Sequence, residues 1–191
     1  TGCTDDDAFN YDCLPDEMPQ MSIGGCGDGI TIDDGSCIYV PDGFEFNQST
    51  LQAFYFFDTA TIGGESLAND DWIGSFRNGY CSNPVATEEY ICDLLSAEWN
   101  PEEICVGARM WGDCGEGIGC DVPAMGDDGT EYTTGYMANG VIPSFKIYDA
   151  SNDVYLDATP SEDFSWSING MFIIDSIESA CNSPLEIDDC G

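Results

Sequence analysis

Charge is the strongest constraint on this sequence, because 37 Asp and Glu residues stand against three basic side chains and no histidine. The formal net charge is −34 over 191 residues. A chain of this charge repels phosphate backbones and anionic lipid surfaces, so we expect no nucleic-acid partner. Without histidine there is no His-based triad, His general base or His-ligated zinc site. The charge favours cation binding, because calcium prefers clustered carboxylate oxygens. The alternative is a solvated acidic coat that binds nothing specific.

The composition still allows a globular fold. Hydrophobic residues make up 42% of the chain and aromatic residues 12%, which is not typical of a disordered acidic tail. A chain of about 190 residues buries roughly 70% of its unfolded surface. No apolar run of 18 residues is present, so we expect no membrane insertion. We therefore expect one main core, with cross-links and bound cations opposing the self-repulsion of the carboxylates.

Eleven cysteines supply candidate cross-links. None forms a CxxC pair, which argues against zinc-ribbon and iron–sulfur sites. Cysteines spread through a Gly- and Asp-rich chain are typical of structural disulfides in an oxidising compartment, so we expect an extracellular or cell-surface location. The number is odd, so one thiol is free or bridges to another molecule, and both alternatives stay open. The chain begins with Thr1, which suits a processed secreted polypeptide or a segment of a larger one.

Residues 1–40 form a segment rich in Asp, Gly and Cys with no helical or strand periodicity. About 40 residues cannot build an adequate core alone, so disulfides or a metal must hold them. A Cys3–Cys37 bridge would bring together the carboxylates near both ends, and a Cys13–Cys26 bridge would close the inner loop. Those carboxylates would make a site of about six to eight oxygens for Ca²⁺. The alternative is that Asp, Asn and Gly here only favour turns.

The motifs at the two ends of this segment carry a resemblance. GCTD with AFNYD at the start, and TIDDGSCIY at the end, resemble the acidic GCTD…DDGSC repeats of large secreted and cell-surface proteins, common in marine bacteria. Those repeats are similar in composition to thrombospondin type 3 calcium-binding repeats. The resemblance implies calcium ligation by the acidic residues of both ends, and Asp7 in the first cluster joins them. The predicted metal ligands here are Asp5, Asp7, Asn10, Asp12, Asp33 and Asp34.

From Phe44 onward, short apolar runs separated by turn signals predict a β domain over residues 44–180. Residues 44–62 have apolar side chains on both alternating sets, as in a strand buried on both faces. Further strands are predicted within residues 71–76, 141–149, 153–158 and 171–177. The fold class is therefore all-β, a β-sandwich of jelly-roll or immunoglobulin-like type. Residues 181–191 are predicted to be a tail tied by Cys181 and Cys190.

Much of this domain also carries the resemblance. The pattern DWIGSF…CVGARMW…CDVPAMGDDG…YTTGYM…IPSFKIYDAS is similar to a β-rich domain that follows GCTD-type repeats in some secreted marine proteins. The similarity covers most of residues 44–178 and implies no catalytic role. Residues 82–104 look inserted between Cys81 and Cys105, with the extra Cys92 as the expected unpaired thiol. Within the insertion, a short helix is expected to place four apolar side chains on one side, either exposed as a contact surface or folded back on the sheet. These are Tyr90, Ile91, Leu94 and Leu95.

Weaker sites lie in the same domain. Asp127 and Asp128 form a second acidic turn that either ligates calcium or shapes the turn. Cys114 and Cys120 are expected to close a small loop, and Asn47 begins an N-glycosylation sequon. Lys146 either forms an isopeptide crosslink or extends along the surface to keep its ammonium in water. Eight aromatic side chains either stack on sugars or fill the core: Trp72, Trp99, Trp111, Trp166, Tyr55, Tyr80, Tyr132 and Tyr136.

Together these observations predict an extracellular, calcium-stabilised structural subunit of a surface fibre, appendage or layer, or a segment of a large adhesin. Its partner would be further copies of itself, in a homo-oligomer or filament. The alternative is a carbohydrate-binding module of a secreted protein, with a glycan as ligand. We expect no enzymatic activity, because the sequence holds no GxSxG nucleophile motif and no phosphate-binding loop, and it offers no convergent catalytic set.

Overall fold

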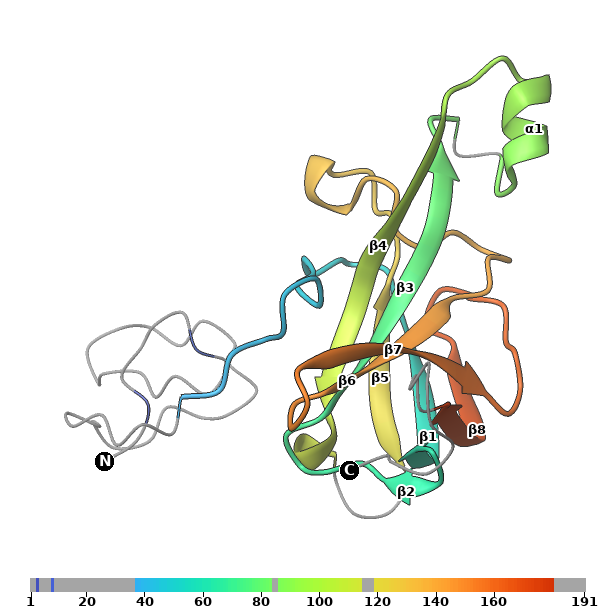
Figure 1. The fold of residues 1–191 in the computed structure, drawn as a ribbon. Coiled ribbons are helices and arrows are strands. Elements are labelled where there is room, and N and C mark those ends of the chain that lie inside the picture. The colour runs from blue at the N-terminus through green and yellow to red at the C-terminus, as the bar shows by residue number, and fades with distance from the viewer. Residues whose placement is uncertain (1–2, 4–7, 9–36, 84–85, 115–118, 181–191) are drawn as a thin grey trace, which may run out of the picture. The chain divides into compact units, whose positions relative to one another are not determined.

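The structure is a computed structural model that describes residues 3, 8, 37–83, 86–114 and 119–180. The chain divides into two compact units, Thr1–Asp42 and Gly43–Gly191 (Figure 1). In the first unit Cys3 is buried and bonded to Cys37, with their Cα atoms 4.6 Å apart. This bond confirms the predicted bridge across the acidic segment. The predicted Cys13–Cys26 and Cys181–Cys190 bonds lie outside the described residues.

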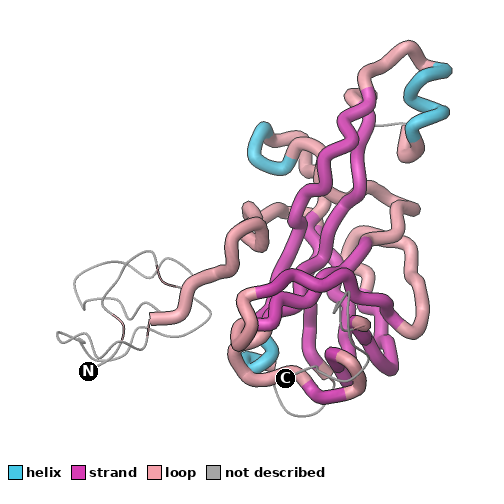
Figure 2. Tube along the Cα trace, viewed as in Figure 1, coloured by secondary structure: helices cyan, strands magenta, loops and turns pink. Residues whose placement is uncertain are grey.

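The second unit is built on a mixed eight-stranded sheet, which confirms the all-β fold class (Figures 1 and 2). Helix in its described part is limited to α1 (Glu89–Leu94) and two short 3-10 turns, Trp111–Asp113 and Glu131–Thr133. The strands follow one another across the sheet in the order β2 (Glu65–Ser66), β1 (Gln52–Ile62), β8 (Met171–Ser179), β7 (Val154–Pro160), β6 (Ser144–Asp149), β3 (Trp72–Cys81) and β4 (Trp99–Met110). The remaining strand, β5 (Cys120–Met125), also pairs with β1. A jelly-roll or immunoglobulin-like sandwich is not confirmed, since the strands form one continuous sheet in which β1 and β8 run parallel.

The sheet folds over on itself at β7. That strand pairs with β6 from Val154 to Ala158 but meets β8 only at Thr159 and Pro160. The two halves of the sheet therefore pack against each other, and the Tyr55 and Phe57 rings of β1 meet the Phe145 ring of β6 edge-on, with centroids 5.5 and 5.2 Å apart. The hydrophobic core lies between these halves.

Strand β1 is at the centre of this core. Ala53, Tyr55 and Phe57 alternate on one face and are each 0% exposed. On the opposite face Phe56 is only 7% exposed, so the first half of the strand is buried on both faces, as predicted. Each buried aromatic ring stabilises the fold by roughly 1.5–3 kcal/mol.

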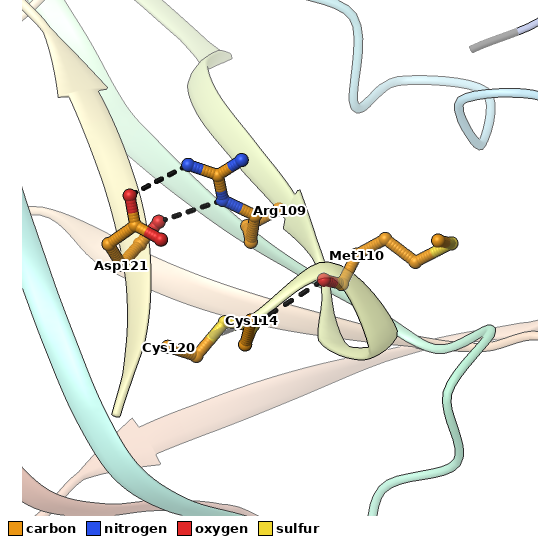
Figure 3. A network of polar contacts seen from close by, with 5 residues as sticks. All are labelled: Arg109, Met110, Cys114, Cys120 and Asp121. Carbon is orange, nitrogen blue, oxygen red and sulfur yellow. Dashed lines mark hydrogen bonds and ion pairs between the residues drawn. A yellow bond between two sulfur atoms is a disulfide. The ribbon is translucent and has the colours of Figure 1, made fainter. Parts of the chain in front are cut away.

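Strand β5 closes the other side of the core by lying against β3 and β4. The Ser75 hydroxyl on β3 donates a hydrogen bond of 2.6 Å to the carbonyl of Pro123 on β5. A side chain on Gly107 of β4 would collide with the same carbonyl, so the close approach depends on glycine there. Arg109 of β4 adds an ion pair of 2.7 Å to Asp121 of β5 (Figure 3).

Strands β3 and β4 form a long hairpin that projects beyond the rest of the second unit and carries α1 at its end (Figure 1). We call residues 82–98, which connect the two strands, the hairpin tip. The predicted insertion of 82–104 is too long, because 99–104 belong to β4. β4 and β5 were not predicted as strands.

The disulfide prediction for the hairpin is wrong in its assignment. Cys81 bonds to Cys92, with their Cα atoms 5.7 Å apart, and among the described cysteines the free thiol is the buried Cys105. The reason is local geometry, since α1 turns Cys92 inward onto the end of β3, where it is 0% exposed. Cys105 lies further down the hairpin, opposite Phe76 on β3, away from that end.

Candidate functional site

A cleft of about 690 Å³ lies in the second unit between the end of β3, the hairpin tip and the segment that follows β5. This volume is in the range of small-molecule sites. Its lining combines polar and apolar side chains. Those on which the argument depends are Arg77, Tyr80, Thr87, Asp127, Asn139 and Trp166.

Arg77 is the buried cation of this cleft. Its residue is 5% exposed, and its guanidinium donates hydrogen bonds to the backbone carbonyls of Tyr136 and Gly79. Those bonds use Nη1 and Nε, so among the described residues Nη2 has no partner. Burial lowers the pKa of Arg77, and the nearby Asp127 carboxylate opposes that effect. The side chain is therefore fixed in orientation with one donor group left over.

Asp128 organises the turn beside the cleft. Its carboxylate accepts hydrogen bonds from the Thr133 and Thr130 hydroxyls at 2.7 and 2.8 Å, and from the Thr50 backbone N–H at 3.1 Å. These donors hold the pKa of Asp128 well below its ordinary value. The carboxylate is thus occupied by groups of the protein, which fits the turn interpretation.

Asp127 also accepts backbone hydrogen bonds within this turn, but among the described residues it accepts fewer hydrogen bonds in total than Asp128 does. One of its oxygens accepts from the Gly129 N–H at 2.9 Å and the other from the Gly135 N–H at 3.3 Å. The second bond holds Gly135 against the Tyr80 ring, so closely that a side chain on this glycine would meet the ring. Each oxygen still has a lone pair to offer, because a carboxylate can accept about four hydrogen bonds.

Calcium stays a prediction throughout the chain. The six predicted ligands of the acidic segment lie outside the described residues: Asp5, Asp7, Asn10, Asp12, Asp33 and Asp34. Over the residues that the structure describes, no three acidic or cysteine side chains gather as a metal-binding group. Asp127 and Asp128 are adjacent there, with their oxygens engaged as described above.

Half of the eight aromatic residues considered for sugar stacking belong to the interior. Tyr55, Trp72, Tyr136 and Trp166 are at most 4% exposed. Only Tyr80 and Trp166 line the cleft, and Trp166 is held there by a hydrogen bond of 2.9 Å from its indole N–H to the Ala124 carbonyl. The remaining three lie outside both the interior and the cleft: Trp99 and Trp111 are half-buried, and Tyr132 is 67% exposed.

Lys146 forms ion pairs. Its Nζ lies 2.8 Å from Glu103 and 3.5 Å from Asp157, and also 5.6 Å from the centre of the Phe76 ring. The hydrogen bond that Lys146 donates to Glu103 raises the pKa of the lysine. An isopeptide bond requires a neutral amine as nucleophile, so these contacts favour the charged surface lysine over the crosslink.

Two further predicted sites are found in the described residues. Cys114 and Cys120 are bonded, as predicted, beside the Arg109–Asp121 ion pair (Figure 3). Asn47 is exposed, and its side-chain amide donates to the Tyr132 carbonyl at 3.1 Å. Glycosylation at Asn47 stays a prediction.

The sequence did not point to Arg77 or Asn139, because they reach the cleft from segments about 60 residues apart and belong to no motif. The one available signal was a basic residue directly after a predicted strand of an acidic chain. Among the helices described, none has the length and apolar character to cross a membrane. Comparisons with protein-family models, curated proteins and solved structures found no match. The function of this protein is therefore inferred from the geometry of its own residues.

Proposed function

We propose that this chain is an extracellular, calcium-stabilised structural module, either a subunit of a surface fibre, appendage or layer or a segment of a large adhesin. The observation that carries the proposal is the hairpin tip. There α1 and the residue after it expose Tyr90, Leu94 and Leu95 by 61, 73 and 45% at the end of a projecting hairpin. Grouped apolar side chains on so acidic a surface are typical of a protein contact.

The way the hairpin tip is built supports a contact role. The Cys81–Cys92 disulfide fixes α1 to the end of β3, and Ile91, Ala97 and Trp99 pack against the bonded pair. A contact surface held in one conformation loses less conformational entropy on binding than a mobile loop. The three disulfides of the described residues also indicate an oxidising environment, which supports an extracellular location.

The test replaces the exposed side chains of α1 without adding charge. We expect Tyr90→Ser with Leu94→Ser to reduce assembly of the purified protein in calcium, measured by electron microscopy and by light scattering after size exclusion. The matched control is Met171→Ser with Ile173→Ser, which removes two side chains that are 69 and 65% exposed on β8. A wild-type protein that stays monomeric in calcium, or a control that dissociates instead of the tip variant, would contradict the proposal.

A second candidate function is a carbohydrate-binding module. The observation in its favour is the cleft, which brings a buried arginine, a carboxylate and an amide together beside an aromatic ring. Sugar sites combine such groups because hydroxyls need both donors and acceptors while the ring faces are apolar. Binding of the whole protein to a glycan array or to insoluble polysaccharides tests this function.

A further inference from the structure

Building on the second candidate function, we propose that the cleft binds a neutral saccharide, with Arg77 as a hydrogen-bond donor and Asp127 as an acceptor for its hydroxyl groups. Both side chains line the cleft and reach it from different elements, Arg77 from β3 and Asp127 from the turn after β5.

Arg77 differs from the other two basic residues in its contacts. The described part of the chain holds all three basic residues, and two of them are ion-paired elsewhere: Arg109 with Asp121, and Lys146 with Glu103 and Asp157. No carboxylate of the described residues lies at ion-pair distance from Arg77, although it is the most buried of the three. Its Nη1 and Nε bind backbone carbonyls, which leaves Nη2 to a ligand.

Asp127 supplies the complementary group. Each of its oxygens already accepts one backbone N–H, which orients the carboxylate and leaves further lone pairs available. No ion pair joins it to Arg77, yet the two charges act on each other across the cleft. A hydroxyl both donates and accepts one hydrogen bond, so it can bind both groups at once.

The charge of the molecule decides between neutral and acidic sugars. The cleft offers one guanidinium, and the Asp127 carboxylate offsets its charge. Around it lies a protein with a net charge of −34. A uronic, sialic or sulfated sugar would meet repulsion without a second cation to hold it, whereas a neutral sugar would not.

The other side chains that line the cleft also suit a neutral saccharide. Ser82 and Thr87 bring exposed hydroxyls from the hairpin tip, and Asn139 brings an exposed amide from the opposite side. Tyr80, Leu51 and Ile168 add apolar surface for the C–H face of a sugar ring. The Cys81–Cys92 disulfide fixes the hairpin tip on one side of these groups, and the Asp128 hydrogen bonds fix the turn after β5, so these parts of the cleft need little ordering on binding.

The experiment compares two matched saccharides on the whole protein in calcium. An α-1,4-linked galactose oligosaccharide and the oligogalacturonate of the same length share sugar configuration and linkage, and differ only in that a carboxylate replaces each hydroxymethyl group. We expect calorimetry or ligand-observed NMR to show binding of the neutral oligosaccharide and at least about ten-fold weaker binding of the acidic one. Other neutral hexose oligomers take its place if an array shows them to bind better.

Variants locate the binding. We expect Ala138→Trp, which fills the cleft, and Asn139→Ala, which removes an exposed amide, to weaken binding, the first by at least about ten-fold. Arg77→Met is expected to abolish binding, and a melting curve shows whether that variant folds. Asn78→Ala is the control, since Asn78 neighbours Arg77 on β3 but is exposed and lies outside the cleft.

The possible outcomes test separately the ligand class, the binding site and the carbohydrate-binding function. Neutral binding that is lost in Ala138→Trp and kept in Asn78→Ala supports the inference. Preference for the acidic oligosaccharide, with the same variant pattern, overturns the ligand class and leaves carbohydrate binding in place. Binding that survives Ala138→Trp overturns the site. If no saccharide binds, the second candidate function fails along with the inference.

Discussion

At the scale of single residues, the scarcity of cations gives each basic side chain a separate role. Arg109 ties β4 to β5, and its side chain is only 13% exposed at the ion pair with Asp121. Lys146 on β6 is bound between carboxylates of β4 and β7. Arg77 alone of the three lines the cleft, and its Nη2 has no partner among the described residues. A chain that opposes so many carboxylates with three cations has none left over for weak surface pairs, which contribute little to stability in any case.

The buried thiol of Cys105 predicts a loss of stability at alkaline pH. Burial raises the pKa of this thiol from about 9 to about 12. As pH rises past 9, the unfolded chain loses the thiol proton while the folded chain keeps it, so the free energy of unfolding falls by up to about 1.4 kcal/mol per pH unit until about pH 12. We expect Cys105→Ala to remove this part of the slope in urea unfolding measured at pH 8, 9 and 10.

The wild-type protein itself serves as a control for this prediction. Its thiol should resist a water-soluble alkylating reagent in the folded state and react after unfolding, because only an exposed thiolate attacks readily. A non-reducing gel after each measurement checks that the exposed thiol has not exchanged with a disulfide. Equal slopes for wild type and Cys105→Ala between pH 9 and 10 would contradict the assignment of Cys105 as the buried group.

At the scale of elements, strands with apolar periodicity were predictable and strands defined by their neighbours were not. The sequences of β1, β6 and β8 either alternate apolar and polar residues or have apolar residues on both faces, and each strand was predicted. β4 begins WNPEEIC and contains Gly107, a composition poor in strand formers. It is a strand because it pairs with β3 along most of its length.

β5 and the cleft could not be predicted either, because both depend on contacts between segments distant in sequence. Pro123 argues against a strand in CDVPAM, yet β5 is held by β1 on one side and by the Ser75 hydroxyl on the other. The cleft arises where three segments distant in sequence meet, and no spacing rule connects them. The turn at Asp127 and Asp128 could be predicted, because its polar side chains bind neighbouring backbone, but its position in the same cleft as Arg77 could not.

The hairpin disulfide gives a prediction that needs no variant. A protease that cleaves after Glu cuts between Cys81 and Cys92 at Glu88 and Glu89, and between Cys92 and Cys105 at Glu98, Glu102 and Glu103. After alkylation in denaturant and digestion of the non-reduced protein, we expect the Cys81 and Cys92 peptides to be joined and the Cys105 peptide to carry the alkyl label. Mass spectrometry detects both the joined peptides and the alkyl label.

Removal of this disulfide should act locally. Replacing Cys81 and Cys92 by Ala opens a loop of 11 residues, for which chain entropy alone predicts a loss of about 2–3 kcal/mol. The loss should come mainly from the hairpin tip, and hydrogen exchange at α1 would report it. A Cys81 peptide joined to Cys105 in the digest would instead contradict Cys92 as the partner of Cys81 and agree with the expectation that Cys92 is the unpaired thiol.

At the scale of the whole molecule, the folded state concentrates carboxylates that the unfolded chain keeps apart. The described ion pairs involve three carboxylates, while 37 acidic residues are present. Folding therefore raises electrostatic repulsion, and the free energy of unfolding must depend on the cations in solution. Two mechanisms can supply them: general screening by salt, or binding of calcium to specific carboxylates.

The last prediction separates these two mechanisms. If calcium binds specifically at about one hundred times its dissociation constant, it stabilises the fold by about 2.7 kcal/mol, or a shift of roughly 5–10 °C in melting temperature for a chain of this length. We expect EDTA at low salt to reverse that shift, and 1 M NaCl, which shortens the Debye length to about 3 Å, to restore only part of it. Asp33→Asn with Asp34→Asn should abolish the calcium response, whereas Asp58→Asn with Glu65→Gln removes the same charge from the β domain and should preserve it. Full recovery in NaCl alone, or equal responses of the two variants, would mean that calcium acts only by screening and that the acidic segment holds no site.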